Sequence, residues 1–277
     1  MQKPEKASKA SSASRRDLFD YSSWLHRRAE EVFRDDTLWA LNKPAGVLSH
    51  PNTAQKKAAN ALLIAPYDAQ RELFRLRRSG ERERQVFLLH RLDLETSGLI
   101  LCAFRAEAAA ALREALYRRE VGKEYRALLV GAPERDEGEW SDCLEKISRQ
   151  GRVEVRVRPR GRPNATTLYR VVKRFPRSGL TLVSLKPRSG RTHQLRVQAA
   201  SRRTPIAGDD RYGNFTANRF LAEKVDLKRM FLHAGRLELR HPTRGHVLKL
   251  TCDFERRLAA PLERVVDLDV RVPRRPS

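Results

Sequence analysis

The chain has 277 residues, 40% of them hydrophobic, which is enough for a buried core with a cleft beside it. Lys and Arg number 57 against 34 Asp and Glu, so the formal net charge is +23, a value that favours nucleic acid over a membrane surface as the partner. Mean hydropathy is −0.63 and no apolar run approaches the ~20 residues of a membrane helix, while three widely spaced cysteines argue against a disulfide framework or a cysteine-based zinc site.

Residues 1–18 predict a disordered basic tail, because they contain hardly any large apolar residue to bury. The tail is either a nonspecific RNA tether or inert. No charged segment leads into an apolar one, which argues against a secretory signal. A targeting segment is harder to dismiss, although Glu5 and Asp17 weigh against it. Together with the odd cysteine count, these features predict a cytoplasmic protein.

Hydrophobic periodicity from residue 19 onward predicts one mixed domain, over 19–265, followed by a C-terminal tail at 266–277. Ala108, Leu112 and Leu116 share a helical face. Val153 to Arg158 alternates strictly, as a half-buried strand does. The predicted strands are 36–41, 124–130, 153–158 and 180–185, and the predicted helices are 105–120 and 192–200, the latter with Thr192 as a possible N-cap. Strands in runs with helices between some of them indicate an α+β or mixed α/β fold.

Basic residues are concentrated in one region. Residues 149–177 contain ten Lys or Arg and a single acid, Glu154. This region is either an ordinary solvated hairpin or an element that grips the RNA backbone. We favour the second, because like charges crowded on one strand face are costly without a polyanion. The arginines expected to bind RNA are Arg156, Arg158, Arg160 and Arg162. In a second charged stretch, 75–84, basic and acidic residues alternate, and a solvated helix explains it equally well.

The segment Leu89–Leu101 combines an Asp, a Glu, a His, an Arg and two hydroxyls with a following apolar strand. Polar groups at the mouth of a buried strand are typical of a binding or catalytic site. Within this segment the carboxylate of Asp93 could be a nucleophile, a base, a metal ligand or a turn cap. Residue types alone do not choose between these roles.

The run from His90 to Asp93, followed by Thr96–Gly98, resembles the signature of the RluA family of RNA pseudouridine synthases. Further segments resemble the family's other motifs, in the family's order, over residues 36 to 255. They are Asn42–Gly46, Lys123–Leu128, Gly190–Arg196, Pro205–Asp209, Tyr212–Gly213 and Phe231–Ala234. The resemblance implies the pseudouridine synthase fold, a mostly antiparallel mixed sheet flanked by helices, with an RNA-binding cleft across it.

The resemblance also implies an isomerase that breaks the N1 glycosidic bond of uridine, rotates the base and rejoins it through C5, without metal or cofactor. Asp93 matches the catalytic carboxylate. Arg196 matches its basic partner, which would keep an Asp ionised in a partly buried pocket. Tyr125 matches the tyrosine that stacks on the base, and Leu195 would form an apolar pocket wall.

Two further residues are expected at the RNA. Arg91 matches a family residue that fills the gap left when the uridine is extracted from its stack, although a salt bridge to Glu95 explains it equally well. Lys43 could contact RNA, but an ordinary surface turn is the simpler explanation. His90 and His193 are expected to be hydrogen-bonded scaffolding. Residues 1–35 are too few for an additional RNA-binding domain, so the chain is expected to be a monomeric catalytic domain.

Other functions were weighed against this one. A noncatalytic RNA-binding or ribosome-assembly protein would have little reason to keep Asp93, Tyr125 and Arg196 together. A glycosidase built on Asp93 and Glu95 is disfavoured, because carboxyls two residues apart rarely span the roughly 5–9.5 Å across a sugar. A metal nuclease is disfavoured, because the sequence has no set of His and carboxylate residues at metal-ligand spacing. Ribosomal RNA is favoured over transfer RNA as the target from the look of the downstream motifs.

Overall fold

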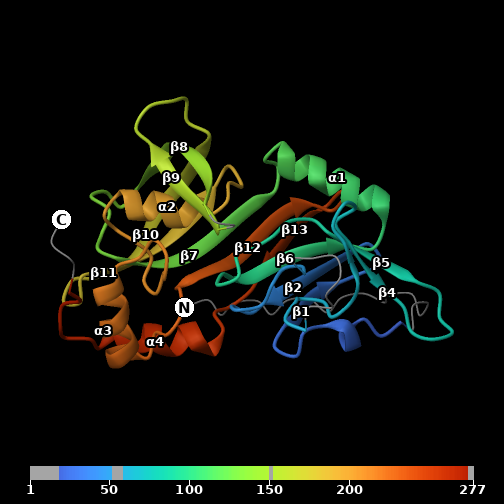
Figure 1. Ribbon diagram of the computed structural model, residues 1–277, viewed down its shortest axis with the longest axis horizontal. Coiled ribbons are helices and arrows are strands. Elements are labelled where there is room, and N and C mark those ends of the chain that lie inside the picture. Colours follow the sequence, from blue (N-terminus) through green and yellow to red (C-terminus); the bar gives the residue numbers. More distant parts are fainter. Residues whose placement is uncertain (1–18, 52–58, 150–151, 274–277) are drawn as a thin grey trace, which may run out of the picture.

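The computed structural model describes residues 19–51, 59–149 and 152–273. The predicted basic tail at 1–18 lies outside this range. The fold is α+β, as expected: one curled sheet carries four α-helices on its faces and edges (Figure 1). Among the described helices, none is both long and apolar enough to cross a membrane. The helices are α1 (Ala106–Tyr117), α2 (Gln194–Ser201), α3 (Phe215–Val225) and α4 (Arg256–Val266), preceded by a 3₁₀ turn at Ser22–Trp24.

The sheet has thirteen strands in the main order β3-β4-β5-β6-β12-β7-β11-β10-β8-β9, with β2 and β1 added beside β6 and β13 beside β12. Each strand pair is antiparallel except β6 with β12. The strands are β1 (Glu30–Arg34), β2 (Leu38–Lys43), β3 (Tyr67–Asp68), β4 (Leu73–Leu76), β5 (Arg84–Leu88), β6 (Ser97–Ala103), β7 (Gly122–Val130), β8 (Glu137–Arg149), β9 (Arg152–Arg158), β10 (Ala165–Phe175), β11 (Leu180–Pro187), β12 (Leu232–Arg240) and β13 (Val247–Thr251).

The parallel contact of β6 with β12 joins two half-sheets that are distant in sequence. Gly98 of β6 is registered with Ala234 of β12. A Cβ at Gly98 would lie 2.3 Å from the carbonyl oxygen of Ala234, and φ at Gly98 is +113°. Only glycine fits here, because it has no Cβ and tolerates positive φ. The glycine that follows the Asp93 loop therefore allows the two halves of the sheet to meet.

Alternation along β7 separates two packing layers. Ala127 and Leu129 pack against Leu195 and Ala199 of α2. Leu128, between them in sequence, points the other way and packs in the cluster that includes residues of α3 and α4. Tyr125 shares the α2 side with Ala127. The strand thus turns Tyr125 toward α2, the helix that carries Arg196.

Most predicted elements are confirmed. The helix predicted at 105–120 is α1, and Glu114 pairs with Arg118 across one turn at 2.6 Å. The stretch 75–84, for which a helix was considered, instead forms the end of β4, a loop and the start of β5. Alternating charges do not distinguish a solvated helix from a hairpin when the stretch contains a single apolar residue, here the buried Leu76. In the predicted C-terminal tail, Val272 is buried and its amide donates to Ser178.

Candidate active site around Asp93

Asp93 lies in the loop between β5 and β6, and its side chain is 29% exposed. Two side chains from elsewhere and an amide of the loop itself hold the loop's backbone. Ser49 Oγ donates to the Leu92 carbonyl at 2.9 Å, and Lys43 Nζ donates to the Leu94 carbonyl at 3.1 Å. The Asp93 carbonyl accepts the Thr96 amide at 3.1 Å. Because successive peptides of the loop are hydrogen-bonded, the backbone position from which the Asp93 side chain projects is fixed, as a catalytic group requires.

Arg196 on α2 is the closest cation to Asp93 among the printed contacts, with its Nη1 3.4 Å from Asp93 Oδ2. The guanidinium is also gripped by Asp209, whose two carboxylate oxygens accept from Nε and Nη2 at 2.8 Å each. The side chain of Arg196 is 7% exposed and that of Asp209 is 1% exposed. A bidentate pair fixes the orientation of a guanidinium, so Asp209 aims the remaining nitrogen of Arg196 at Asp93.

Arg196 and Asp209 both stay ionised. Burial alone would lower the pKa of Arg196, but the hydrogen bonds and charge of Asp209 outweigh burial and raise that pKa above its usual range. Burial likewise acts to raise the pKa of Asp209, but Arg196 and the backbone amides of Tyr212 and Arg211 bring it below the usual value. Arg196 therefore remains a cation beside Asp93 at any physiological pH.

Tyr125 enters the site from β7, where it is registered with Ala234 on β12 and Leu185 on β11. It packs among apolar residues that include Leu195. Burial, and then the charge of Asp93, raises the pKa of the Tyr125 hydroxyl well above its usual range. The hydroxyl thus keeps its proton, and the negative charge of Asp93 contributes to this effect. The structure brings the four residues Asp93, Tyr125, Leu195 and Arg196 together.

Two predicted scaffold histidines lie around this centre. His90 Nε2 accepts the amide of Leu101 at 3.1 Å, and burial lowers the pKa of His90 to about 3, so the imidazole is neutral. His193 Nδ1 lies 2.8 Å from the hydroxyl of Tyr212, whose ring lies under the guanidinium of Arg196 at 5.2 Å. His193, in the left-handed region at φ 53°, is the N-cap of α2. The predicted cap, Thr192, lies one residue earlier.

Lys43 requires a correction. It is neither in a surface turn nor available to RNA, because its side chain is 0% exposed. Its Nζ donates to the carbonyls of Pro44, Val47 and Leu94, the last of which follows Asp93. Burial lowers its pKa to about 7. An amine that satisfies three backbone acceptors supports the Asp93 loop from below instead of contacting a phosphate.

Arg91 is exposed, as an RNA-contacting side chain must be, and it does not form the salt bridge to Glu95 that was considered. Its Nη1 lies 3.0 Å from His50 Nε2, and the His50 ring stacks on Tyr67 with centroids 4.8 Å apart. The neighbour of Arg91 is thus an aromatic stack from which the guanidinium can swing away without leaving a carboxylate unpaired.

The predicted RNA-binding arginines lie on and after β9, in the β8–β9 hairpin. Arg156 and Arg158 project from one face, and Arg160 and Arg162 are exposed in the following turn. Glu145 of β8 lies between the first two, 3.1 Å from Arg156 and 3.9 Å from Arg158. The crowding of like charges is therefore relieved in part by an acid from the neighbouring strand, which sequence periodicity did not reveal.

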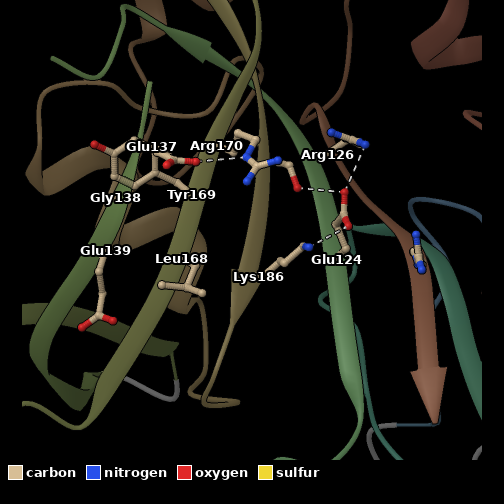
Figure 2. A pocket seen from close by; sticks show the side chains of 11 residues that line it. Glu124, Arg126, Glu137, Gly138, Glu139, Leu168, Tyr169, Arg170 and Lys186 are labelled. Atoms are coloured by element: carbon tan, nitrogen blue, oxygen red, sulfur yellow. Dashed lines mark hydrogen bonds and ion pairs between the residues drawn. The ribbon is translucent and has the colours of Figure 1, made fainter. Parts of the chain in front are cut away.

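A separate pocket lies elsewhere on the sheet. It has a volume of about 650 Å³ and includes Glu124 and Arg126, which flank Tyr125 on β7 and so point to the opposite face of the sheet (Figure 2). Three of its charged residues pair with one another: Glu124 pairs with Arg126 at 3.0 Å and with Lys186 at 3.5 Å. This pocket is separate from the Asp93 site.

Asp209 is the main functional residue that sequence reasoning did not single out. It belonged to the quoted segment Pro205–Asp209 but was assigned no role. In the structure the glycine before it is forced: φ at Gly208 is +75°, and a Cβ there would lie 2.0 Å from the carbonyl oxygen of Arg229. Glycine fits because it has no Cβ and tolerates positive φ, but the sequence alone does not reveal this close approach.

Fold and site together define the class. A curled mixed sheet presents a loop carboxylate, a buried arginine and a partly buried tyrosine on one face, which is the arrangement expected of a pseudouridine synthase. Two human proteins of solved structure share the fold. RNA Pseudouridylate Synthase Domain Containing 4 superposes with a TM-score of 0.61 at 24% identity, over 85% of this chain and 92% of that one. RNA Pseudouridylate Synthase Domain Containing 1 gives 0.60 at 25% identity, over 82% and 84%.

The chain belongs to the RNA pseudouridylate synthase family, whose model matches residues 37–201. Ribosomal large subunit pseudouridine synthase C of Salmonella typhi is 33% identical over 241 residues, 84% of this chain and 68% of that protein. The enzyme of the same name from Escherichia coli (strain K12) is 33% identical over 243 residues, 84% of this chain and 69% of its own length. The protein is thus a pseudouridine synthase, an isomerase, and spans about two thirds of the length of these relatives.

Proposed function

We propose that this enzyme isomerises specific uridines in structured ribosomal RNA, with Asp93 as the catalytic carboxylate. The observation that carries the proposal is the chain of contacts from Asp209 through Arg196 to Asp93, with distances of 2.8 and 3.4 Å, beside the partly buried Tyr125. The names of the relatives, which refer to the large ribosomal subunit, favour ribosomal over transfer RNA.

In this proposal each side chain has a separate task. Asp93 acts as the ionised group beside the sugar and base while the N1–C1′ bond breaks and the C5–C1′ bond forms. The proton lost from C5 is balanced by the proton gained at N1, so the reaction is redox-neutral. Tyr125 stacks on the base and Leu195 forms the apolar wall. Arg91 occupies the gap in the RNA left by the extracted uridine.

The proposed RNA surface extends from the Asp93 loop to the β8–β9 hairpin. Arg156, Arg158, Arg160 and Arg162 would supply phosphate contacts there. Glu145, which pairs with the first two, would give way to phosphate when RNA binds. An exposed ion pair of this kind contributes only ~0–1 kcal/mol, so little is lost in the exchange.

Pseudouridine mapping of total RNA tests the proposal. Cells lacking this protein should lose pseudouridine at one or more positions of large-subunit ribosomal RNA. Wild-type protein should restore the modification, and Asp93→Asn should not, because asparagine keeps the volume but not the charge. Loss of pseudouridine only at positions of transfer RNA would show that the substrate is transfer RNA and not ribosomal RNA. Restoration by Asp93→Asn would remove Asp93 from the chemistry, and an unchanged map would favour a noncatalytic role in ribosome assembly.

A further inference from the structure

Arg229, which the chemistry proposed above does not use, lies behind the Asp93 loop. It lies three residues before the start of β12, and its side chain is 9% exposed. Its Nη2 donates to the Glu95 carbonyl at 3.2 Å and to Ser97 Oγ at 3.0 Å. Glu95 lies in the short segment that joins Asp93 to β6, and Ser97 is the first residue of β6. A buried guanidinium thus holds the downstream half of the catalytic loop.

The other terminal nitrogen of Arg229 pairs with Glu255. Glu255 is the N-cap residue of α4, a helix anchored in the core by Leu258 and Val265. Burial lowers the pKa of Arg229 to about 10, which still leaves it a cation at neutral pH. Glu255 supplies a counter-charge to the buried guanidinium of Arg229. Removing Glu255 would leave that guanidinium uncompensated, so the pair holds Arg229 in place.

The backbone of Arg229 meets the other side of the site. Its carbonyl oxygen lies where a Cβ of Gly208 would be, and Gly208 immediately precedes Asp209. Asp209 in turn fixes the guanidinium of Arg196 that faces Asp93. One residue is therefore in contact with the segment that carries the carboxylate and with the segment that aims its cationic partner.

The loop carbonyls from Leu92 to Glu95 all accept hydrogen bonds, and their donors come from different parts of the chain. Ser49 and Lys43, near the N-terminal strands, hold Leu92 and Leu94, and the Thr96 amide holds Asp93. Arg229 holds Glu95. It is the donor in this set that comes from the C-terminal third of the chain.

We infer that Arg229, held by Glu255, is a positioning residue that sets the distance between Asp93 and Arg196. The inference rests on the proposed role of Asp93. A catalytic group displaced by about 1 Å loses on the order of 100-fold in rate, because the reacting atoms no longer meet in a productive geometry. RNA affinity should not change, because the side chains of Arg229 and Glu255 are only 9% and 21% exposed and offer little surface to RNA.

The test compares Glu255→Gln, Arg229→Gln and Arg229→Lys with wild type, Asp93→Asn and a control on α4. The control is Arg264→Gln, which removes an exposed ion pair with Asp226 from the same helix. Three quantities are measured: the single-turnover rate constant at saturating RNA, the Kd for RNA, and the Tm. Ribosomal RNA fragments that contain the mapped uridine are the substrate.

We expect Glu255→Gln and Arg229→Gln to lower the rate constant by ~10-fold or more with little change in Kd, and Arg229→Lys to recover part of the loss. Arg264→Gln should match wild type. If Arg229→Gln does not fold, Glu255→Gln decides. A rate constant in Glu255→Gln within twofold of wild type, whatever its Tm, overturns the inference. Equal rates in wild type and Asp93→Asn would instead overturn the proposed function, so the two failures are distinguishable.

Discussion

Two arginine–carboxylate pairs of similar length behave differently in this enzyme because of burial. Arg196 and Asp209 meet at 2.8 Å with side chains 7% and 1% exposed. Arg156 and Glu145 meet at 3.1 Å on the β8–β9 hairpin with side chains 61% and 33% exposed. The buried pair is a fixed part of the site, since neither charge has an alternative partner in water. The exposed pair is screened by salt and water, so Glu145 is easily exchanged for another anion, as the proposed binding of RNA phosphate to this hairpin requires.

Removing the buried cation should have the largest effect. Arg196→Ala leaves Asp209 buried and uncompensated, and we expect a loss of unfolding free energy of ~3–5 kcal/mol together with loss of isomerisation. Arg196→Lys should retain some activity, because it restores the charge without the planar fork. Chemical denaturation and single-turnover assays measure both effects. A wild-type rate in Arg196→Ala would mean that the cation facing Asp93 is dispensable.

Tyr125→Phe separates stacking from proton transfer within the buried site. Phenylalanine keeps the aromatic face, so RNA affinity should hold. If the hydroxyl moves a proton, the single-turnover rate constant should fall by ~100-fold or more. Because the pKa of Tyr125 is raised, the wild-type hydroxyl stays protonated throughout the neutral range and the loss should not depend on pH there. Equal rates for the two proteins would leave Tyr125 only a stacking role.

Lys43 offers a pH-dependent probe of the buried region. Its folded-state pKa is about 7, below the ordinary value of 10.5, so the unfolded chain binds more protons between these values. The resulting stability is present above about pH 10.5 and is lost as the pH falls through about 7, with a slope of up to ~1.4 kcal/mol per pH unit. Lys43→Met should lack this dependence.

The difference in unfolding free energy between wild type and Lys43→Met, measured from pH 6 to pH 10, isolates the contribution of Lys43 from other titrating groups. We expect the difference to grow in favour of wild type as the pH rises. A difference that is flat with pH would show that the amine is not desolvated.

The smallest effect on chemistry should come from the exposed hairpin. Replacing Arg156, Arg158, Arg160 and Arg162 by Gln should weaken binding to all RNA sequences alike and reduce the salt slope by roughly 0.7–0.9 per engaged charge. The rate constant at saturating RNA should hardly change. The control removes the same charge from other exposed arginines, at Arg77, Arg82, Arg118 and Arg119. Parallel log–log salt plots for wild type and the hairpin variant would exclude the hairpin from the RNA surface.

Much of the site could be predicted because its residues lie in short motifs whose types and order are informative. Asp93, Tyr125 and Arg196 are assigned from such motifs, and the structure brings them together. The bidentate grip of Asp209, the burial of Lys43 and the position of Glu145 beside Arg156 could not be predicted. Each depends on contacts between segments far apart in sequence, and local patterns contain no information on which distant group fills a given space.

The fold itself was predicted to the level of class and of most elements, because strict alternation at 153–158 and helical spacing at 105–120 are strong local signals. The stretch 75–84 and the cap of α2 were less predictable, because charged residues there are compatible with several solvated conformations.

The parallel pairing of β6 with β12 affects when the active site forms during folding. Ser97 and His233, which are bonded across it at 2.9 Å, lie 136 residues apart. Contacts of such long range form late in folding, since a large loop must close first. When a nascent chain has emerged from the ribosome up to Asp93, it contains the carboxylate. It does not yet contain Arg196, the cationic partner, or β12, the strand that completes the sheet. Catalytic competence should therefore arrive in a single late step, so that incomplete or truncated chains cannot modify the RNA around them.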